Sequence, residues 1–442
     1  MATSPFDSTL YRDLFHDAEI GRLFTDSAEV RAMLLVEGAL AKVQGQMGVI
    51  PEISGAFIHR ASMELQVDPG GLAPETGLSA VPVPALVAAF RKAMEAPEHG
   101  QYVHWGATSQ DIIDTALVLR LRQALTVIET RLSAVLAALA ALADAHAQQP
   151  MAARTLSQTA TPTSFGAVVA SWGWPLIRHR DRLAELRPRL LRVSLFGAAG
   201  TLSAMGEKGP EVRAGLAEAL GLSDPGDVWH TGRDTLGELS GWLTGLAGSL
   251  GKIGEDLVLL AQSDTGEVRL AGAGGSSTLP HKQNPIAPSV LCALARHLVG
   301  LNANMQGALA HRQQRDAAAY LVEWLSLPQI VMGAARGLAV AEALVPAIEP
   351  QPSAMAAHID DGTGLAYAEA LSFALAGQMP RPDAQAKAKG LAQEARDTGT
   401  PLARLAARDW PGTDWGALFT PQAQMGEAPE QAARFVAAVK GV

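Results

Sequence analysis

Apolar residues recur at alternating intervals of three and four along three long segments of this 442-residue chain. The segments begin at Ile128, Leu243 and Val290. This spacing places one apolar seam along a long α-helix, as in a helical bundle or a coiled coil. Additional apolar residues lie off the seams, among them Leu259 and Val299. A helix that is apolar around much of its circumference is buried on several sides, which indicates a bundle core or a subunit interface.

The composition favours helices over sheets. Hydrophobic residues make up 48% of the chain but aromatic residues only 5%, so most of the apolar residues are Ala, Leu and Val. Ala and Leu are strong helix formers, and no stretch alternates with period two for long enough to predict a sheet. We therefore expect a mostly α protein with an N-terminal helical domain over 1–103, a central helical bundle over 104–348 and a C-terminal helical domain over 349–442.

Charge and cysteine content exclude several classes of partner and site. The net charge is −9, without a run of Lys or Arg, so nucleic acid is not an expected partner. Cys292 is the only cysteine, which rules out an internal disulfide and a zinc–thiolate cluster, and its apolar surroundings predict a buried thiol. No basic start followed by an apolar stretch is present, and no apolar segment of about 18 residues is expected. A soluble, cytoplasmic protein without a membrane partner is predicted.

The first polar cluster is HWGATSQD, which begins at His104. Thr108 and Ser109 are suited to cap a helix that starts near Gln110, and the free N–H groups at such a start bind anions. His104, Thr108, Ser109 and Gln110 are therefore candidate substrate-binding residues. The alternative is a capping motif with no further role.

The second polar cluster is ARTLSQTATPTSFG, which begins at Ala153. Arg154, Gln158 and Thr159 supply several hydrogen-bond donors and are candidate substrate ligands. The pair after Pro162 is suited to cap the next helix. A polar turn between two helices is an equally good interpretation of this stretch.

The third cluster is GAGGSSTLPHKQNP, residues 272–285. Its glycines and prolines predict a loop, and it is either a solvated surface loop or a mobile active-site loop. Further on, Arg315 and Asp316 come just before another helical segment. An exposed Arg in a helix ordinarily pairs with an acid one turn away, and Arg315 has that alternative.

The chemistry of the three clusters converges on carboxylate binding. Hydroxyl and amide groups occur together with Arg154, Lys282 and Arg315, and such donors bind polyanions. Competing chemistries lack their motifs, since HExxH, GxGxxG, a Walker loop and GxSxG are all missing. No metal and no cofactor are expected.

GSSTLPHKQNP resembles the signature loop of the fumarase/aspartase superfamily, usually written G-S-S-x-M-P-x-K-x-N-P. Leu279 replaces the common Met, and the other signature positions match. The two other polar clusters resemble the superfamily's remaining active-site regions in order and spacing. The resemblance implies a three-domain, mostly α fold whose central helices form a tetrameric core. It also implies a homotetramer in which different subunits contribute to each active site.

The resemblance also implies the chemistry of the site. The superfamily moves a proton at the carbon α to a carboxylate, while a group leaves or joins the β carbon, through an aci-carboxylate intermediate. Ser277 is then the general base, with Ser276 as second choice, and Lys282 and Asn284 bind the substrate carboxylate. His104, Thr108, Ser109, Gln110, Arg154, Gln158, Thr159 and Arg315 complete the predicted substrate contacts.

Leu156 departs from the superfamily members that expel an amine or hydroxide. Those members carry R-T-H-x-Q in the second region, and the His helps to protonate the leaving group. An amine or hydroxide needs such a general acid, whereas a carboxylate, with a conjugate-acid pKa of about 4, leaves without one. Leu156 therefore favours the superfamily's cycloisomerases, which add a carboxylate across a C=C bond to close a lactone. Their small tricarboxylate substrate suits Arg154, Lys282 and Arg315.

Two other hypotheses compete with this one. The first is an adenylosuccinate- or argininosuccinate-type lyase that releases fumarate and uses a different acid, for which His104 and His230 are the candidates. The second is a non-catalytic structural homologue. The retained Ser276, Ser277, Lys282 and Asn284 argue against the second, since a scaffold has no use for such a loop.

Overall fold

The computed structural model describes residues 4–272, 274–275, 278–279 and 281–441, and this part of the chain is mostly helical. It divides into two compact units. Unit 1 comprises Met1–Arg131, His179–Gly248 and Ala293–Ala339, and unit 2 comprises Leu132–Arg178, Ser249–Cys292 and Val340–Val442. The predicted mostly α class is confirmed, and the predicted three-domain boundaries stay a prediction.

Five long helices contribute residues to both units: α8 (Ser109–Ala145), α9 (Phe165–Leu190), α11 (Asp234–Leu260), α12 (Ile286–Gly307) and α13 (Ala317–Leu344). Unit 1 also contains η1 (Pro5–Asp7), α1 (Arg12–Phe15), α2 (Ala18–Gly21), α3 (Asp26–Gln46), α4 (Glu52–Glu64), η2 (Pro69–Leu72), α5 (Ala73–Ser79), α6 (Val83–Met94), α7 (Pro97–Gly100), η3 (Ser203–Lys208) and α10 (Gly209–Leu220).

Unit 2 holds the short strands and the C-terminal helices. They are β1 (Pro150–Thr155), β2 (Gln158–Ser164), β3 (Val268–Leu270), β4 (Gly274–Gly275), β5 (Gln283–Asn284), η4 (Val345–Ala347), β6 (Ile348–Pro350), α14 (Pro352–Ile359), η5 (Leu365–Tyr367), α15 (Ala368–Ala376), α16 (Arg381–Thr398), α17 (Leu402–Asp409), α18 (Trp415–Leu418), α19 (Pro421–Gln424) and α20 (Ala428–Lys440). The strands pair antiparallel as β1–β2, β3–β6 and β4–β5.

The three predicted apolar seams lie on α8, α11 and α12. On α11 every predicted seam position from Leu243 to Leu260 is buried, which confirms the helical interpretation. Cys292 on α12 is buried, as its apolar context predicted. Leu259 and Val299 lie off the seams and are more than half exposed in the single chain.

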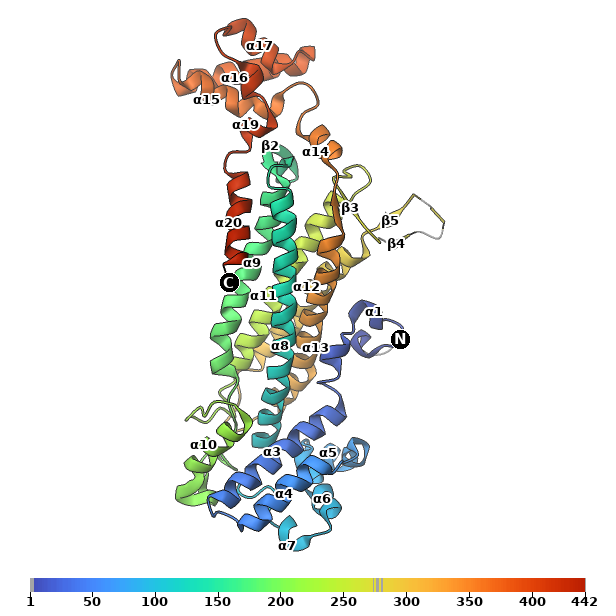
Figure 1. Ribbon diagram of the computed structural model, residues 1–442, viewed down its shortest axis with the longest axis vertical. Coiled ribbons are helices and arrows are strands. Elements are labelled where there is room, and N and C mark those ends of the chain that lie inside the picture. Colours follow the sequence, from blue (N-terminus) through green and yellow to red (C-terminus); the bar gives the residue numbers. More distant parts are fainter. Residues whose placement is uncertain (1–3, 273, 276–277, 280, 442) are drawn as a thin grey trace. The chain divides into compact units, whose positions relative to one another are not determined.

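The core of unit 1 forms where α3 and α4 lie side by side (Figure 1). Gly55 permits this close approach, because a Cβ there would lie 2.5 Å from the Ala41 carbonyl oxygen. Leu40 and Ile58 are buried in the same cluster, together with Phe90 of α6. This core supports the turn that leads into α8, and the first predicted polar cluster lies on that turn.

Two sequence-based expectations about secondary structure and hydropathy are wrong. The second polar cluster is a β-hairpin, β1–β2, rather than a turn between helices. Three helices are also long and apolar enough to cross a membrane by length and composition, namely Ser109–Ala145, Ile286–Gly307 and Ala317–Ala347. An Ala- and Leu-rich helix that packs on several sides carries as few charges as a membrane-spanning helix, so length and composition do not distinguish the two.

Candidate functional site

His104 lies in the turn between α7 and α8, with a left-handed backbone (φ +64°). Its Nδ1 donates to the Glu37 carboxylate on α3 at 2.7 Å. The Glu37 side chain is buried and that of His104 is mostly buried. Burial opposes the charged imidazole, but the Glu37 carboxylate outweighs it, so the pKa of His104 is raised. The ring therefore stays cationic to a higher pH than a free histidine, which suits it to a carboxylate ligand.

The Asp111 carboxylate caps the start of α8. The helix begins at Ser109, and the Asp111 carboxylate accepts from the Thr108 backbone N–H at 3.0 Å, as in half of a capping box. Thr108 is buried and Ser109 is half-buried. The Asp111 N–H donates to the Thr108 carbonyl at 3.0 Å, whereas the two N–H groups before it have no i−4 partner within the helix. The helix dipole favours negative charge at this end.

Gln110 and His230 form hydrogen bonds in the interior of unit 1. The Gln110 side-chain nitrogen donates to Asp114 at 3.2 Å and to the His230 carbonyl at 2.8 Å. The His230 ring is buried, and its Nε2 donates to Asp111 at 2.7 Å. The bond to Asp111 fits a structural role for His230. Among the predicted substrate-binding residues of unit 1, Gln110 is the least favoured, because its side-chain nitrogen already donates to two protein groups.

Arg315 lies on the surface of unit 1 just before α13, as predicted. Its guanidinium donates to the carbonyl of Ala198. Together with Gln313 and Gln314 it lines an open recess of about 460 Å³. The neighbouring Asp316 caps α13 by accepting from the Ala318 and Ala319 N–H groups. The guanidinium retains further N–H groups for an anion in the recess.

In unit 2, Arg154 lies on β1 and is paired with a buried acid. Its two Nη atoms donate to the Glu267 carboxylate at 2.7 and 2.8 Å, and His358 Nδ1 lies 3.1 Å from the same carboxylate. Glu267 is fully buried. Two of the five guanidinium N–H groups are thereby committed, so three remain for a substrate carboxylate.

The hairpin turn after Arg154 consists of Leu156 and Ser157. Both residues have left-handed backbones, with φ +50° and +62°, as a two-residue type I′ turn requires. The Leu156 side chain is 98% exposed. The predicted cap of the following helix is confirmed, since the Ala167 N–H donates to Ser164 Oγ at 3.1 Å.

Gln158 and Thr159 begin β2 and are exposed. Thr159 also lines a recess of about 570 Å³ with His358, and three acids, Asp360, Asp361 and Glu369, line the same recess. Three carboxylates repel a polyanion, so this recess does not suit the predicted substrate.

The predicted active-site loop is closed at its base by a short ladder. Gly274 pairs with Asn284, and Gly275 pairs with Gln283. Lys282 is exposed and Asn284 is half-buried beside this ladder. Ser276 and Ser277, the predicted catalytic serines, lie outside the described residues.

The predicted site residues thus form two sets. The unit 1 set comprises His104, Thr108, Ser109, Gln110 and Arg315, and the unit 2 set comprises Arg154, Gln158, Thr159, Lys282 and Asn284. Within the described ranges, no group of three or more His, Cys, Asp or Glu residues is arranged to hold a metal.

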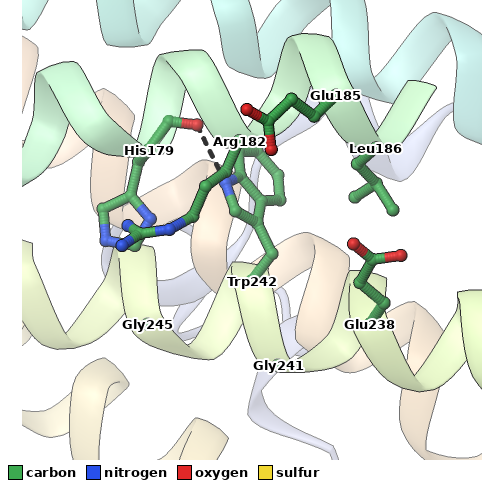
Figure 2. A pocket seen from close by; sticks show the side chains of 8 residues that line it. All are labelled: His179, Arg182, Glu185, Leu186, Glu238, Gly241, Trp242 and Gly245. Carbon is green, nitrogen blue, oxygen red and sulfur yellow. Dashed lines mark hydrogen bonds between the residues drawn. The ribbon is translucent and has the colours of Figure 1, made fainter.

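A further recess of about 420 Å³ lies between α9 and α11 in unit 1 (Figure 2). Trp242 is fixed in its wall because the indole N–H donates to the His179 carbonyl at 3.0 Å. None of the residues that line this recess belongs to the predicted site. It is therefore separate from the predicted site residues.

Sequence reasoning missed Glu37 and Glu267, the two acids that orient His104 and Arg154. Each acid is far from its partner along the chain, by 67 and 113 residues. An isolated Glu within a helix or before a short strand carries no local pattern that distinguishes it from a solvated acid.

Comparisons with known proteins support one family. The family model described as "Lyase" matches residues 25–300. The chain is 41% identical over 380 residues to 3-carboxy-cis,cis-muconate cycloisomerase of Pseudomonas aeruginosa, which covers 84% of this chain and 82% of the relative. It is 36% identical over 432 residues to the protein of the same name in Bradyrhizobium diazoefficiens, which covers 95% of each. The crystal structure of 3-carboxy-cis,cis-muconate lactonizing enzyme from Pseudomonas putida matches with a TM-score of 0.92 at 35% identity, covering 98% of this chain and 99% of that one.

Proposed function

This chain belongs to the lyase family of the fumarase/aspartase superfamily, and we propose that it is a 3-carboxy-cis,cis-muconate cycloisomerase. The reaction is an intramolecular lactonisation of 3-carboxy-cis,cis-muconate to a carboxymuconolactone, a step in protocatechuate degradation by the β-ketoadipate pathway. The substrate is a small tricarboxylate, and neither a cofactor nor a metal takes part.

The observation that carries this proposal is Leu156. It occupies the turn of the β1–β2 hairpin, two residues after Arg154, with its side chain exposed. A leucine neither donates a proton nor holds a proton-donating water. The chain therefore lacks a proton donor where amine- and hydroxide-expelling relatives carry one, which suits a reaction whose leaving or adding group is a carboxylate.

Both residue sets contain cations suited to a polycarboxylate. His104 and Arg315 are the cations of unit 1, and Arg154 and Lys282 are those of unit 2. Glu37 and Glu267 offset the charges of His104 and Arg154, so the net positive charge comes from Arg315 and Lys282. In the lactonising direction, a substrate carboxylate oxygen bonds to one carbon of a C=C bond. The electron pair of that bond moves into the adjacent carboxylate, giving an aci-carboxylate that Lys282 and Asn284 stabilise. Ser277 then delivers a proton to the α carbon and regains one from solvent, so the lactone, written as its acid, is an isomer of the substrate acid.

The test is a comparison of substrates with the purified protein. Consumption of 3-carboxymuconate, followed as loss of the diene absorbance, is expected. No turnover at high enzyme concentration, or fumarate release from adenylosuccinate or argininosuccinate, would contradict the proposal.

The proton-transfer role has its own test. Ser277→Ala is expected to lower kcat by about 10²–10⁴, the usual contribution of a positioned acid or base. Ser276→Ala is the matched control, with a small expected effect. The reverse outcome would transfer the role to Ser276.

We further propose that the protein is a cytoplasmic homotetramer with active sites shared between subunits. The long helices present small and apolar residues at the surface of the single chain. A Cβ at Gly241 of α11, or at Gly300 or Gly307 of α12, would meet no atom within 4 Å, and Val299 is 60% exposed. Such faces let the helices of another copy approach closely. Other copies, rather than lipid, would then cover the apolar helices.

A further inference from the structure

One carboxylate in unit 1 organises the region around the start of α8. Asp111 is fully buried and accepts hydrogen bonds from five groups. The donors are Thr108 N at 3.0 Å, Ser194 Oγ at 3.3 Å, Phe196 N at 3.0 Å, Gly197 N at 2.9 Å and His230 Nε2 at 2.7 Å. Two oxygens with this many donors need the full acceptor capacity of an ionised carboxylate.

A second residue on the same face of α8, Thr115, also binds the chain segment 193–197. Thr115, one helical turn after Asp111, donates to the Ser194 carbonyl at 3.0 Å and accepts from the Ser194 N–H at 2.8 Å. The segment is thus fixed at Ser194 by Thr115 and at Phe196 and Gly197 by Asp111.

Gly197 connects this segment to both parts of the unit 1 set. Its backbone is left-handed (φ +71°), and a Cβ there would lie 3.2 Å from the Gly106 carbonyl oxygen, in the turn that carries His104. The next residue, Ala198, offers the carbonyl that accepts from Arg315. Asp111 is therefore bonded directly to the helix start at Thr108. It is connected to Arg315 indirectly, because it binds Gly197 and the next residue, Ala198, accepts from Arg315.

We propose that Asp111 is a positioning residue. It fixes the position of Arg315 relative to the Thr108–Ser109 helix start, so that Arg315 and the helix start bind the same polycarboxylate. This inference rests on the proposed function. A shift of about 1 Å in a positioned group is enough to weaken its interactions severely, and a buried carboxylate bonded to backbone N–H groups resists such a shift.

The experiment combines Asp111→Asn with Arg315→Ala in a double-mutant cycle. The readouts are KM for 3-carboxymuconate and the Kd of propane-1,2,3-tricarboxylate, a saturated probe, measured by calorimetry. In Asp111→Asn the amide NH₂ faces N–H groups, so KM and Kd are expected to rise by about tenfold or more, with a smaller change in kcat. In the Arg315→Ala background, Asp111→Asn is expected to add clearly less than in the wild type, because its effect on Arg315 is already lost.

Thr115→Val is the matched control. It removes the other anchor of the same segment, so it is expected to lower Tm while leaving KM and Kd within about twofold of the wild type. If Asp111→Asn does not fold, Gly197→Ala is used in its place in the same cycle. It strains the backbone beside Ala198, and its loss of affinity is also expected to be clearly smaller in the Arg315→Ala background.

Additive losses in the cycle, or an equal loss of affinity in Thr115→Val, would overturn the role of Asp111 while leaving the proposed function intact. A wild-type protein that binds the probe but does not consume 3-carboxymuconate would contradict the proposed function alone. A wild-type protein that does neither would overturn both.

Discussion

At the residue scale, the pairing of His104 with Glu37 makes the free energy of unfolding depend on pH. The folded pKa of His104 is raised, since the Glu37 carboxylate outweighs the effect of burial. The folded state thus binds the proton more tightly than the unfolded state. The stabilisation is fully present below the unfolded pKa, near 6.5, and is lost as pH rises through the raised folded pKa.

This predicts the behaviour of His104→Gln. The free energy of unfolding of the wild type should exceed that of the variant most at about pH 6, and the excess should shrink towards about pH 9. Denaturant titrations across this range measure the difference. The trend should disappear when Glu37→Gln is present in both proteins. A trend that persists in that background would assign it to another partner of the ring.

Leu156 predicts a stabilising substitution. A left-handed backbone costs an ordinary residue about 1–2 kcal/mol, and an exposed side chain provides no packing to offset it. Asn tolerates this conformation and is favoured in type I′ turns. Leu156→Asn should raise the free energy of unfolding by about 0.5–1 kcal/mol.

The matched control for this substitution is Leu78→Asn. Leu78 is also exposed but lies within the helix α5, so no gain is expected there. Denaturant unfolding of both variants decides the matter. A loss of stability in Leu156→Asn would mean that Leu156 is covered in the assembled protein.

At the scale of elements, a buried ion network joins three helices of unit 1. Arg233, directly before α11, donates to Asp114 of α8 at 2.7 and 3.0 Å and to Glu323 of α13 at 2.9 and 2.6 Å. The Tyr320 hydroxyl also donates to Asp114 at 3.0 Å. Arg233 and Asp114 are fully buried and Glu323 nearly so, and Arg233 is the cation that the two acids share, while Glu323 also lies 3.4 Å from His311 Nε2.

Removing that guanidinium should therefore be costly. Arg233→Met removes the shared guanidinium from two buried carboxylates, and the expected loss in free energy of unfolding is about 3–5 kcal/mol. Arg189→Met is the control, because Arg189 and Glu238 form a pair that is about half exposed, and such a pair contributes at most about 1 kcal/mol. Similar losses in the two variants would show that the buried network contributes no more than a surface pair.

At the scale of the whole molecule, the exposed apolar positions on the long helices predict assembly. Val299→Glu places a charge on the outward face of α12, where another copy is proposed to pack. The variant should sediment as a smaller species than the tetramer and lose activity, because the sites are shared. Leu78→Glu, at an even more exposed apolar position on α5, should keep both mass and activity. A tetrameric, active Val299→Glu protein would locate the interface elsewhere.

The sequence by itself determined the features that a few neighbouring residues encode. The seams on α8, α11 and α12, the Ser164 cap and the family signature at 275–285 are local patterns, and the structure confirms the helices and the cap. The β1–β2 hairpin was missed because its Thr-rich alternation is too short to stand out from a polar turn.

Only the tertiary structure decided which acid pairs with which His or Arg. Glu37 meets His104, Glu267 meets Arg154 and Asp111 meets His230 across separations of 67, 113 and 119 residues. Helical periodicity encodes which face of a helix is buried, because that depends on near neighbours along the chain. The partner of a buried charge depends instead on which distant segments pack together, and no local pattern records it.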